Sequence, residues 1–238
     1  MLRKTFALVG TAALLLVLLA ACRSSVQRPS VLRNSVPQLS GPQPGDMIAT
    51  ITTDRGTIKA VLFRDAAPNA VDNFVGLAQE GYYDGVLFHR VVEDFVIQSG
   101  DPTGTGTGGQ SIWGTSFSCE YSRQLHNYSG ALAMVSDASG QNNSQFYIVT
   151  TPPDSVSQIL AQKLLSAGFD RDVVSTYREV GGAPYLDCKS TVFGQVYSGM
   201  EIADDIDATA TIAERPKKDI RIQSITIETY ADAGSAAG

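Results

Sequence analysis

The stretch FHRVVEDFVIQSGDPTGTGTGG, residues 88–109, carries the clearest architectural signal in the chain. β-Branched and aromatic residues dominate this region and predict strands over residues 83–92 and 95–98. Gln98 is a lone polar residue inside the second apolar strand, so its side chain needs a buried hydrogen-bond partner. The glycines of residues 104–109 predict a loop. Two short strands followed by a glycine-rich loop therefore form the centre of the pattern.

Short strands continue on both sides of this stretch. Residues 47–53 and 56–63 are β-branched runs on either side of Asp54 and Arg55, which predicts a hairpin. Residues 68–78 carry apolar side chains at helical spacing, with proline in the first turn, which predicts a helix. Many short strands with scattered helices indicate an antiparallel barrel or sandwich. Further strands are expected at residues 132–135, 145–150, 191–196 and 220–229, and a short helix at 199–208.

An insertion between about residues 152 and 184 has helical rather than strand periodicity. Asp154 or Ser155 can cap a first helix that ends at Gly168, and a second helix ends at Gly181. Two interpretations remain open, a helical pair packed on the barrel and a flap or docking surface beside the site. The predicted apolar stripes consist of Val156, Ile159, Leu160 and Leu164 in the first helix and Val173, Val174, Tyr177 and Val180 in the second.

The first 45 residues differ in composition from the rest. Residues 1–21 have a positive start and then an uncharged apolar run, and Cys22 follows two alanines. This arrangement resembles a bacterial lipoprotein signal, which implies cleavage before Cys22 and its lipidation. A plain signal peptide and an uncleaved anchor are the alternatives. Residues 22–46 contain four prolines and predict a tether, and residues 230–238 predict a disordered tail.

Composition argues against several classes of protein. Among 238 residues, 18 Lys and Arg stand against 24 Asp and Glu, and the net charge of −6 disfavours nucleic-acid binding. Residues 104–109 satisfy G-x-G-x-x-G, but Pro102 precedes them and no helix is expected after them, so we expect no nucleotide. Two histidines and no CxxC pair argue against structural zinc, and we expect no metal or other cofactor. Cys119 and Cys188 could form a disulfide or remain free thiols.

Five sequence blocks follow one another along the chain: FHRV at 88–91, FVIQSGDP at 95–102, GALAM at 130–134, SQFYI at 144–148, and YLD at 185–187 with TVFG at 191–194. In this order they resemble the cyclophilin-type peptidyl-prolyl cis-trans isomerases. The resemblance covers residues 47–229 and implies a closed eight-stranded antiparallel β-barrel, mainly β, capped by two helices. It also implies a groove for proline peptides on the outside of the barrel.

Arg90 matches the family's catalytic arginine. Rotation about an X–Pro bond meets a barrier of ~18–20 kcal/mol from amide resonance, so the site needs a donor that stabilises the twisted amide. A guanidinium is always charged and presents several N–H groups. The family match places the substrate-binding residues at Phe95, Val96, Gln98, Met134, Val135, Ser136, Gln145, Tyr147, Tyr185, Leu186 and Ser190.

Four of these positions depart from the family pattern. Tyr185 replaces the usual tryptophan, Ser190 the usual histidine, and Val135-Ser136 the usual Ala-Asn, which changes the expected sequence preference more than the activity. The expected function is isomerisation of X–Pro bonds in unfolded exported proteins, by a monomer anchored through Cys22 to the extracytoplasmic face of the cell membrane. The alternative is a non-catalytic module on the cell envelope that binds proline peptides or unfolded chains.

Overall fold

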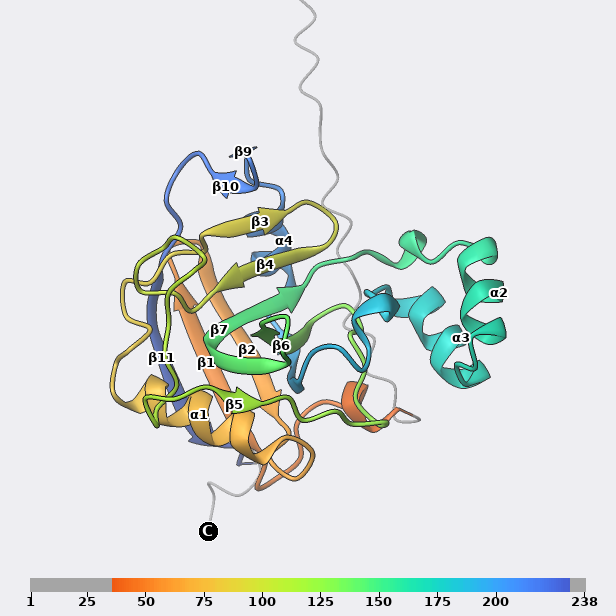
Figure 1. Cartoon of the computed structure of the whole chain (residues 1–238), viewed down its shortest axis with the longest axis horizontal. Coiled ribbons are helices and arrows are strands. Elements are labelled where there is room, and N and C mark those ends of the chain that lie inside the picture. Colours follow the sequence, from red (N-terminus) through yellow and green to blue (C-terminus); the bar gives the residue numbers. More distant parts are fainter. Residues whose placement is uncertain (1–35, 232–238) are drawn as a thin grey trace, which may run out of the picture.

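The structure, a computed structural model, describes residues 36–231. It is built mainly from short strands with four α-helices (Figure 1). The strands are β1 Met47–Thr53, β2 Gly56–Leu62, β3 Arg90–Val92, β4 Val96–Ser99, β5 Phe117–Ser118, β6 Ala131–Ser136, β7 Gln141–Val149, β8 Val192–Ser198, β9 Thr211–Ile212, β10 Arg215–Pro216 and β11 Ile222–Thr229. The α-helices are α1 Pro68–Gln79, α2 Gln158–Ser166, α3 Arg171–Val180 and α4 Met200–Asp207.

The main sheet is an antiparallel, curled half-barrel. Its strand order is β11-β1-β2-β8-β6-β7-β4-β3, and β5 pairs with β7 beside this path. The predicted closed barrel is wrong, because the end strands β11 and β3 share no ladder. β3 has only three residues, and the rest of the predicted strand 83–92 is a turn followed by irregular chain, in which Leu87 forms an isolated bridge with Arg221, the residue before β11.

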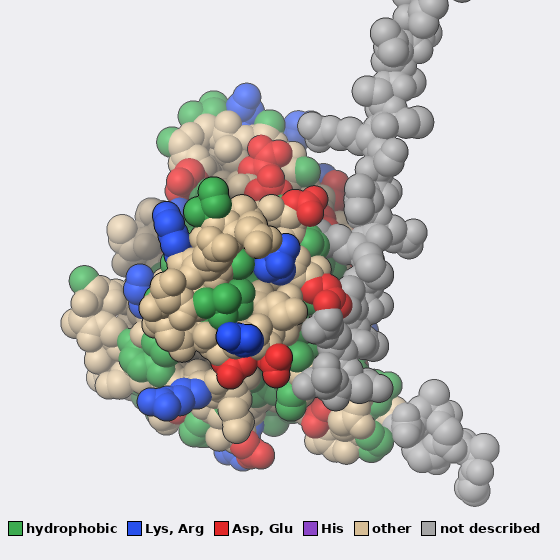
Figure 2. All heavy atoms as spheres, turned by 90° about the vertical axis from the view of Figure 1, so that its right-hand side faces the viewer, with side chains coloured by type: hydrophobic (Ala, Val, Ile, Leu, Met, Phe, Trp, Pro, Cys, Tyr) green, Lys and Arg blue, Asp and Glu red, His purple; other side chains and the backbone are tan. Residues whose placement is uncertain are grey.

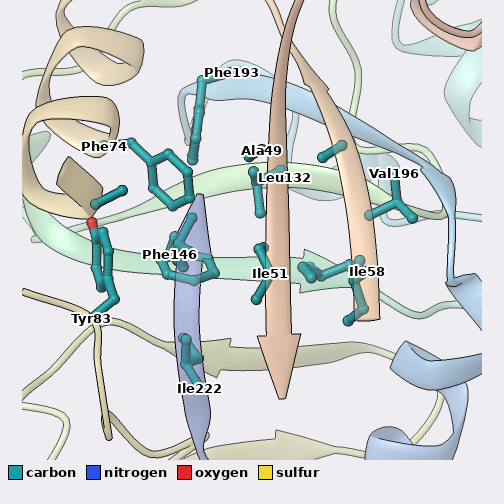
Figure 3. Close-up of a cluster of buried hydrophobic side chains, with 14 of the residues drawn as sticks. Ala49, Ile51, Ile58, Phe74, Tyr83, Leu132, Phe146, Phe193, Val196 and Ile222 are labelled. Atoms are coloured by element: carbon teal, nitrogen blue, oxygen red, sulfur yellow. The ribbon is translucent and has the colours of Figure 1, made fainter. Parts of the chain in front are cut away.

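The main hydrophobic core fills the inside of the curled sheet (Figure 3). Phe74 of α1 lies at its centre, with its ring centroid 5.2–5.3 Å from the rings of Tyr83, Phe146 and Phe193. α1 begins at Pro68, where the missing N–H costs nothing, and turns Phe74 and Leu77 towards the sheet. Because the inward side chains of β7 are Phe146 and Ile148, its alternate residues face outward.

The insertion forms the helical pair α2 and α3 at one side of the sheet (Figure 1). Ser157 caps α2 and Asp170 caps α3, whereas the predicted caps Asp154 and Ser155 lie in a preceding 3-10 turn. Ile159, expected in the apolar stripe, is 67% exposed. A separate hydrophobic cluster joins the insertion to the body through Leu39, Tyr128, Val156, Ala161, Leu164, Val174 and Tyr177.

The end of the predicted tether is packed on the body. Residues 37–39 form a 3-10 turn that buries Gln38 and Leu39. The Gln38 amide donates to the His126 carbonyl and accepts from the His126 N–H, both at 2.8 Å. The folded body therefore begins about ten residues before position 47. The predicted signal 1–21 and Cys22 lie outside the described residues, as does most of the tail.

Within residues 36–231, no helix has the length and hydropathy needed to span a membrane. On the side of the molecule where α2 and α3 lie, acidic and basic side chains are interspersed on the surface (Figure 2).

Candidate active site

An apolar hollow of about 190 Å³ lies on the outer side of the sheet. Nine predicted substrate-binding residues and the predicted catalytic Arg90 line it, while Gln145 and Tyr185 lie just beyond its wall. Lys189, which no sequence pattern indicates, also lines the hollow. Arg90 comes from β3, and the others are Phe95, Val96 and Gln98 at β4, Met134, Val135 and Ser136 on β6, Tyr147 on β7, and Leu186 and Ser190 before β8.

Strand register brings the polar and aromatic groups of the hollow together. Arg90 of β3 pairs with Gln98 of β4, and Gln98 pairs in turn with Tyr147 of β7. Residues directly opposite each other in an antiparallel ladder project from the same face. These three side chains are therefore neighbours on the outer face, although they come from three different strands.

Two polar groups hold the guanidinium of Arg90. Its Nε donates to Glu214 Oε2 at 2.7 Å, and its Nη1 lies 3.4 Å from Gln98 Oε1. The side chain is 36% exposed, so one edge of the guanidinium remains open to a ligand in the hollow. Arg90 therefore takes part in a surface ion pair and also lines the hollow.

Gln98 has the buried hydrogen-bond partner that the sequence requires, and this partner is Gln145. Gln98 Nε2 donates to Gln145 Oε1 at 2.9 Å, and Gln145 Nε2 donates to the carbonyls of Gly106 and Gly108. Gln145 therefore connects the polar side of the hollow to the glycine loop. Gln145 contacts Gln98, which lines the hollow, but does not line the hollow itself.

The glycine loop surrounds a carboxylate that the sequence analysis did not single out. Asp101 is fully buried and accepts backbone N–H groups from Thr103, Thr105, Gly106 and Gly108. Burial opposes ionisation, but these hydrogen bonds and that of the Thr103 hydroxyl outweigh it and lower the pKa of Asp101 to about 2. The N–H groups that a phosphate would need thus already have a carboxylate partner.

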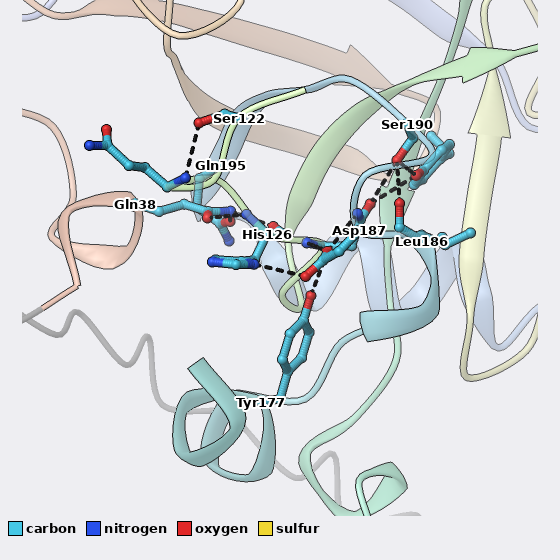
Figure 4. A network of polar contacts seen from close by, with 11 residues as sticks. Gln38, Ser122, His126, Tyr177, Leu186, Asp187, Ser190 and Gln195 are labelled. Carbon is cyan, nitrogen blue, oxygen red and sulfur yellow. Dashed lines mark hydrogen bonds and ion pairs between the residues drawn. The ribbon is translucent and has the colours of Figure 1, made fainter. Parts of the chain in front are cut away.

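The back of the hollow is a buried hydroxyl cluster (Figure 4). The Tyr147 hydroxyl lies 2.8 Å from Asn127 Oδ1 and 2.7 Å from Ser190 Oγ. Burial raises the pKa of Tyr147, so the hydroxyl keeps its proton. Ser190, at the usual histidine position, therefore completes a neutral, hydrogen-bonded wall.

Tyr185 and the cysteines lie at the edges of the site. Tyr185 is 54% exposed, and its ring centroid lies 5.7 Å from that of Phe95, so it extends the apolar rim. Cys119 and Cys188 are both free thiols, which decides the alternative left open by the sequence. Cys119 Sγ lies 3.0 Å from the hydroxyl of Ser136, at one end of the hollow.

A second hollow, of about 420 Å³, lies on the other side of Arg90. Glu214 lines it from the turn between β9 and β10, where Ala213 and Glu214 have φ values of +49° and +65°. Non-glycine residues rarely adopt this conformation, so the turn holds the carboxylate of Glu214 in place at some conformational cost. His89 also lines this hollow, and burial lowers the pKa of its imidazole.

A charged donor beside an apolar hollow suits rotation of an X–Pro bond. The ring of proline needs an apolar surface, and the amide nitrogen regains its lone pair as the bond twists. The comparisons agree with this chemistry. The family model of the cyclophilin-type peptidyl-prolyl cis-trans isomerases matches residues 48–227. This chain belongs to that family.

Relatives and solved cyclophilins cover the whole domain. A Staphylococcus aureus protein named as a peptidyl-prolyl cis-trans isomerase is 42% identical over 187 residues, which is 78% of this chain and 94% of that protein. A Streptococcus pyogenes protein, named as a bifunctional phosphatase/peptidyl-prolyl cis-trans isomerase, is 45% identical over 181 residues. That match covers 75% of this chain but only 38% of the relative.

The solved structure of a Cryptosporidium parvum cyclophilin-type isomerase is also similar. It superposes with a TM-score of 0.63 at 28% identity, covering 78% of this chain and 99% of that one. A second structure, of the same protein in the presence of the dipeptide Ala-Pro, gives a TM-score of 0.62 at 29% identity, covering 77% and 99%. The cyclophilin resemblance inferred from the sequence is thereby confirmed, and with it the isomerase class.

Proposed function

We propose that this cyclophilin-type isomerase accelerates X–Pro rotation in exported proteins while a lipid on Cys22 holds it at the extracytoplasmic face of a membrane. The observation that carries the catalytic part is the Arg90 guanidinium at the edge of an apolar hollow. The apolar run of residues 1–21 and the position of Cys22 support the anchor. Uncatalysed X–Pro isomerisation takes tens to hundreds of seconds, which makes it a slow step for chains that fold outside the cytoplasm.

The side chains divide the reaction between gripping and stabilisation. Phe95, Val135 and Leu186 supply the apolar surface that holds the proline ring and excludes water, while the side chain of Met134 is fully buried in the main core beneath it. Arg90 donates towards the amide whose resonance is lost on twisting, and no bond forms or breaks. One preorganised donor of this kind typically contributes a factor of ~10²–10³ in rate. Glu214 and Gln98 hold this donor before the peptide arrives.

Exchange spectroscopy on a proline tetrapeptide tests the catalytic part, with wild type and Arg90→Ala compared at equal concentration. We expect acceleration by the wild type and a loss of about 100-fold in Arg90→Ala, with an unchanged thermal midpoint because Arg90 is partly exposed. Binding of the peptide by a wild type that gives no acceleration would refute the isomerase function and leave the binding module.

The anchor is tested separately, in cells that export the full chain. Wild type should fractionate with the membrane and carry a diacylglyceryl mass at Cys22, whereas Cys22→Ala should lose both. A wild type that is released in soluble form, or that keeps residues 1–21, would refute lipid anchoring while leaving the isomerase function intact.

A further inference from the structure

The loop that forms one wall of the proline hollow is built around a buried carboxylate. Asp187 lies between the lining residues Leu186 and Ser190, and its side chain is 7% exposed. The backbone N–H and Nδ2 of Asn127 donate to its Oδ1 at 2.8 and 3.0 Å, and Nδ1 of His126 lies 2.7 Å from its Oδ2. A buried carboxylate is tolerated only when its oxygens are satisfied in this way.

The remaining donor to Asp187 comes from the insertion. The Tyr177 hydroxyl of α3 donates to Asp187 Oδ1 at 2.8 Å, and its ring points from the helix directly at the carboxylate (Figure 4). The Tyr177 side chain is fully buried. Burial, with the nearby charge of Asp187, holds the pKa of Tyr177 well above its usual value, so the hydroxyl retains the proton that it donates.

The same carboxylate is connected to the buried hydroxyl cluster at the back of the hollow. Asn127 uses Nδ2 for Asp187 and its Oδ1 for the hydroxyl of Tyr147. Ser190 Oγ lies within reach of both Asn127 Oδ1 and the Tyr147 hydroxyl. A chain of hydrogen bonds thus runs from Tyr177 through Asp187 and Asn127 to Tyr147, which lines the hollow.

The insertion is attached rigidly at the end that carries Tyr177. Gly182 forms a bridge with Tyr128, and the Ala183 N–H donates to the Asn127 carbonyl at 2.8 Å. Gly181 and Gly182 both have positive φ, and a Cβ on either would collide with backbone atoms of the body. These contacts favour a fixed support over the flap that the sequence also allowed.

We propose that the α2–α3 insertion positions the wall of the proline pocket, and that Tyr177 is the positioning residue that does so through Asp187. The inference rests on the isomerase function proposed for the same site. Tyr177 does not touch the substrate. Its hydroxyl keeps Leu186 and Ser190 at the distance that fits the proline ring, and it leaves the guanidinium of Arg90 untouched. Loss of this hydroxyl therefore weakens ground-state binding and transition-state binding alike.

The test compares kcat and KM of the full chain for a proline tetrapeptide in wild type, Tyr177→Phe and Asp170→Ala. Tyr177→Phe keeps the buried ring and removes only the hydroxyl. We expect KM to rise about fivefold to tenfold, less than for full loss of a hydrogen bond to a charged group because Asp187 keeps its contacts with His126 and Asn127, with kcat within about twofold of wild type. Asp170→Ala removes the cap of α3 and destabilises the same helix without touching Asp187, so it should leave KM unchanged.

Three results would overturn the positioning role. They are an unchanged KM in Tyr177→Phe, an equal rise in KM in Asp170→Ala, and a fall in kcat without a change in KM. If Tyr177→Phe does not fold, Asp187→Asn takes its place, with the same increase in KM expected. Absence of acceleration by the wild type would refute the isomerase function itself, and the positioning role with it.

Discussion

Glu214 should matter for catalysis more than for stability. Its carboxylate binds Arg90 Nε at 2.7 Å, but the two side chains are 52% and 36% exposed, so the ion pair contributes only ~0.2–1 kcal/mol to folding. Its larger effect is to restrict Arg90, since a free arginine side chain has ~2 kcal/mol of rotamer entropy. If the contact of Nε with Glu214 already removes half of this rotamer entropy before the peptide binds, Glu214→Ala loses about 1 kcal/mol of preorganisation. This corresponds to a loss of about fivefold in kcat/KM.

The assay is tetrapeptide isomerisation at 0.1 M and 1 M salt, with the thermal midpoint as the control for folding. Glu214→Gln retains an acceptor oxygen and should lie within about twofold of wild type at 0.1 M salt. Because the Debye length falls from ~10 to ~3 Å over this range, high salt should reduce the difference between wild type and Glu214→Ala. A kcat/KM for Glu214→Ala equal to that of wild type at both salt concentrations would show that Glu214 does not hold the catalytic arginine.

Two further predictions concern the loop and the backbone. The pKa of Asp101 is about 2 in the folded chain and 3.8 without its partners, so the carboxylate contributes ~2 kcal/mol of stability above pH 4 that is lost as the pH falls towards 2. In urea unfolding, Asp101→Asn should have a lower free energy of unfolding than wild type at pH 7, and this free energy should change less with pH below pH 4. Parallel pH curves for the two proteins would contradict this. Gly199→Ala should lower the thermal midpoint more than Gly168→Ala, because both have positive φ but only the Gly199 Cβ would meet the Thr57 carbonyl; equal shifts would show that the contact relaxes.

Local chemistry made much of the fold predictable. The hairpin β1–β2 and the helix α1 begin where the sequence indicates, because the turn at Asp54 and the proline at the helix start are local signals. The pattern of residues 83–89 predicts a strand, but the structure has a turn and irregular chain there, from which the aromatic and branched side chains enter the core. β7 begins at Gln141, four residues before the predicted start, because its polar first residues are ordered by pairing with β5 and β6.

The candidate site divides along the same line. Arg90, Gln98 and Tyr147 could be predicted because family resemblance named them, and strand register confirms that they are neighbours. Glu214 could not be predicted, since it lies 124 positions from Arg90 in a short hairpin with no catalytic signature. The role of Asp101 depends on how the following glycine loop folds back, which spacing alone does not show.

The two walls of the hollow depend on different ranges of contact. Arg90 and Gln98 are only 8 positions apart and are held by one strand pair. The opposite wall depends on distant contacts, 60 positions between Asn127 and Asp187 and 88 between Gln38 and His126. Loop-closure entropy makes such contacts costlier to form. We therefore expect that disrupting the hydrophobic cluster between the insertion and the body first displaces the wall that contains Leu186. The β3–β4 strand pair still holds Arg90 at that stage, so the affinity for peptide falls before the rate of bond rotation does.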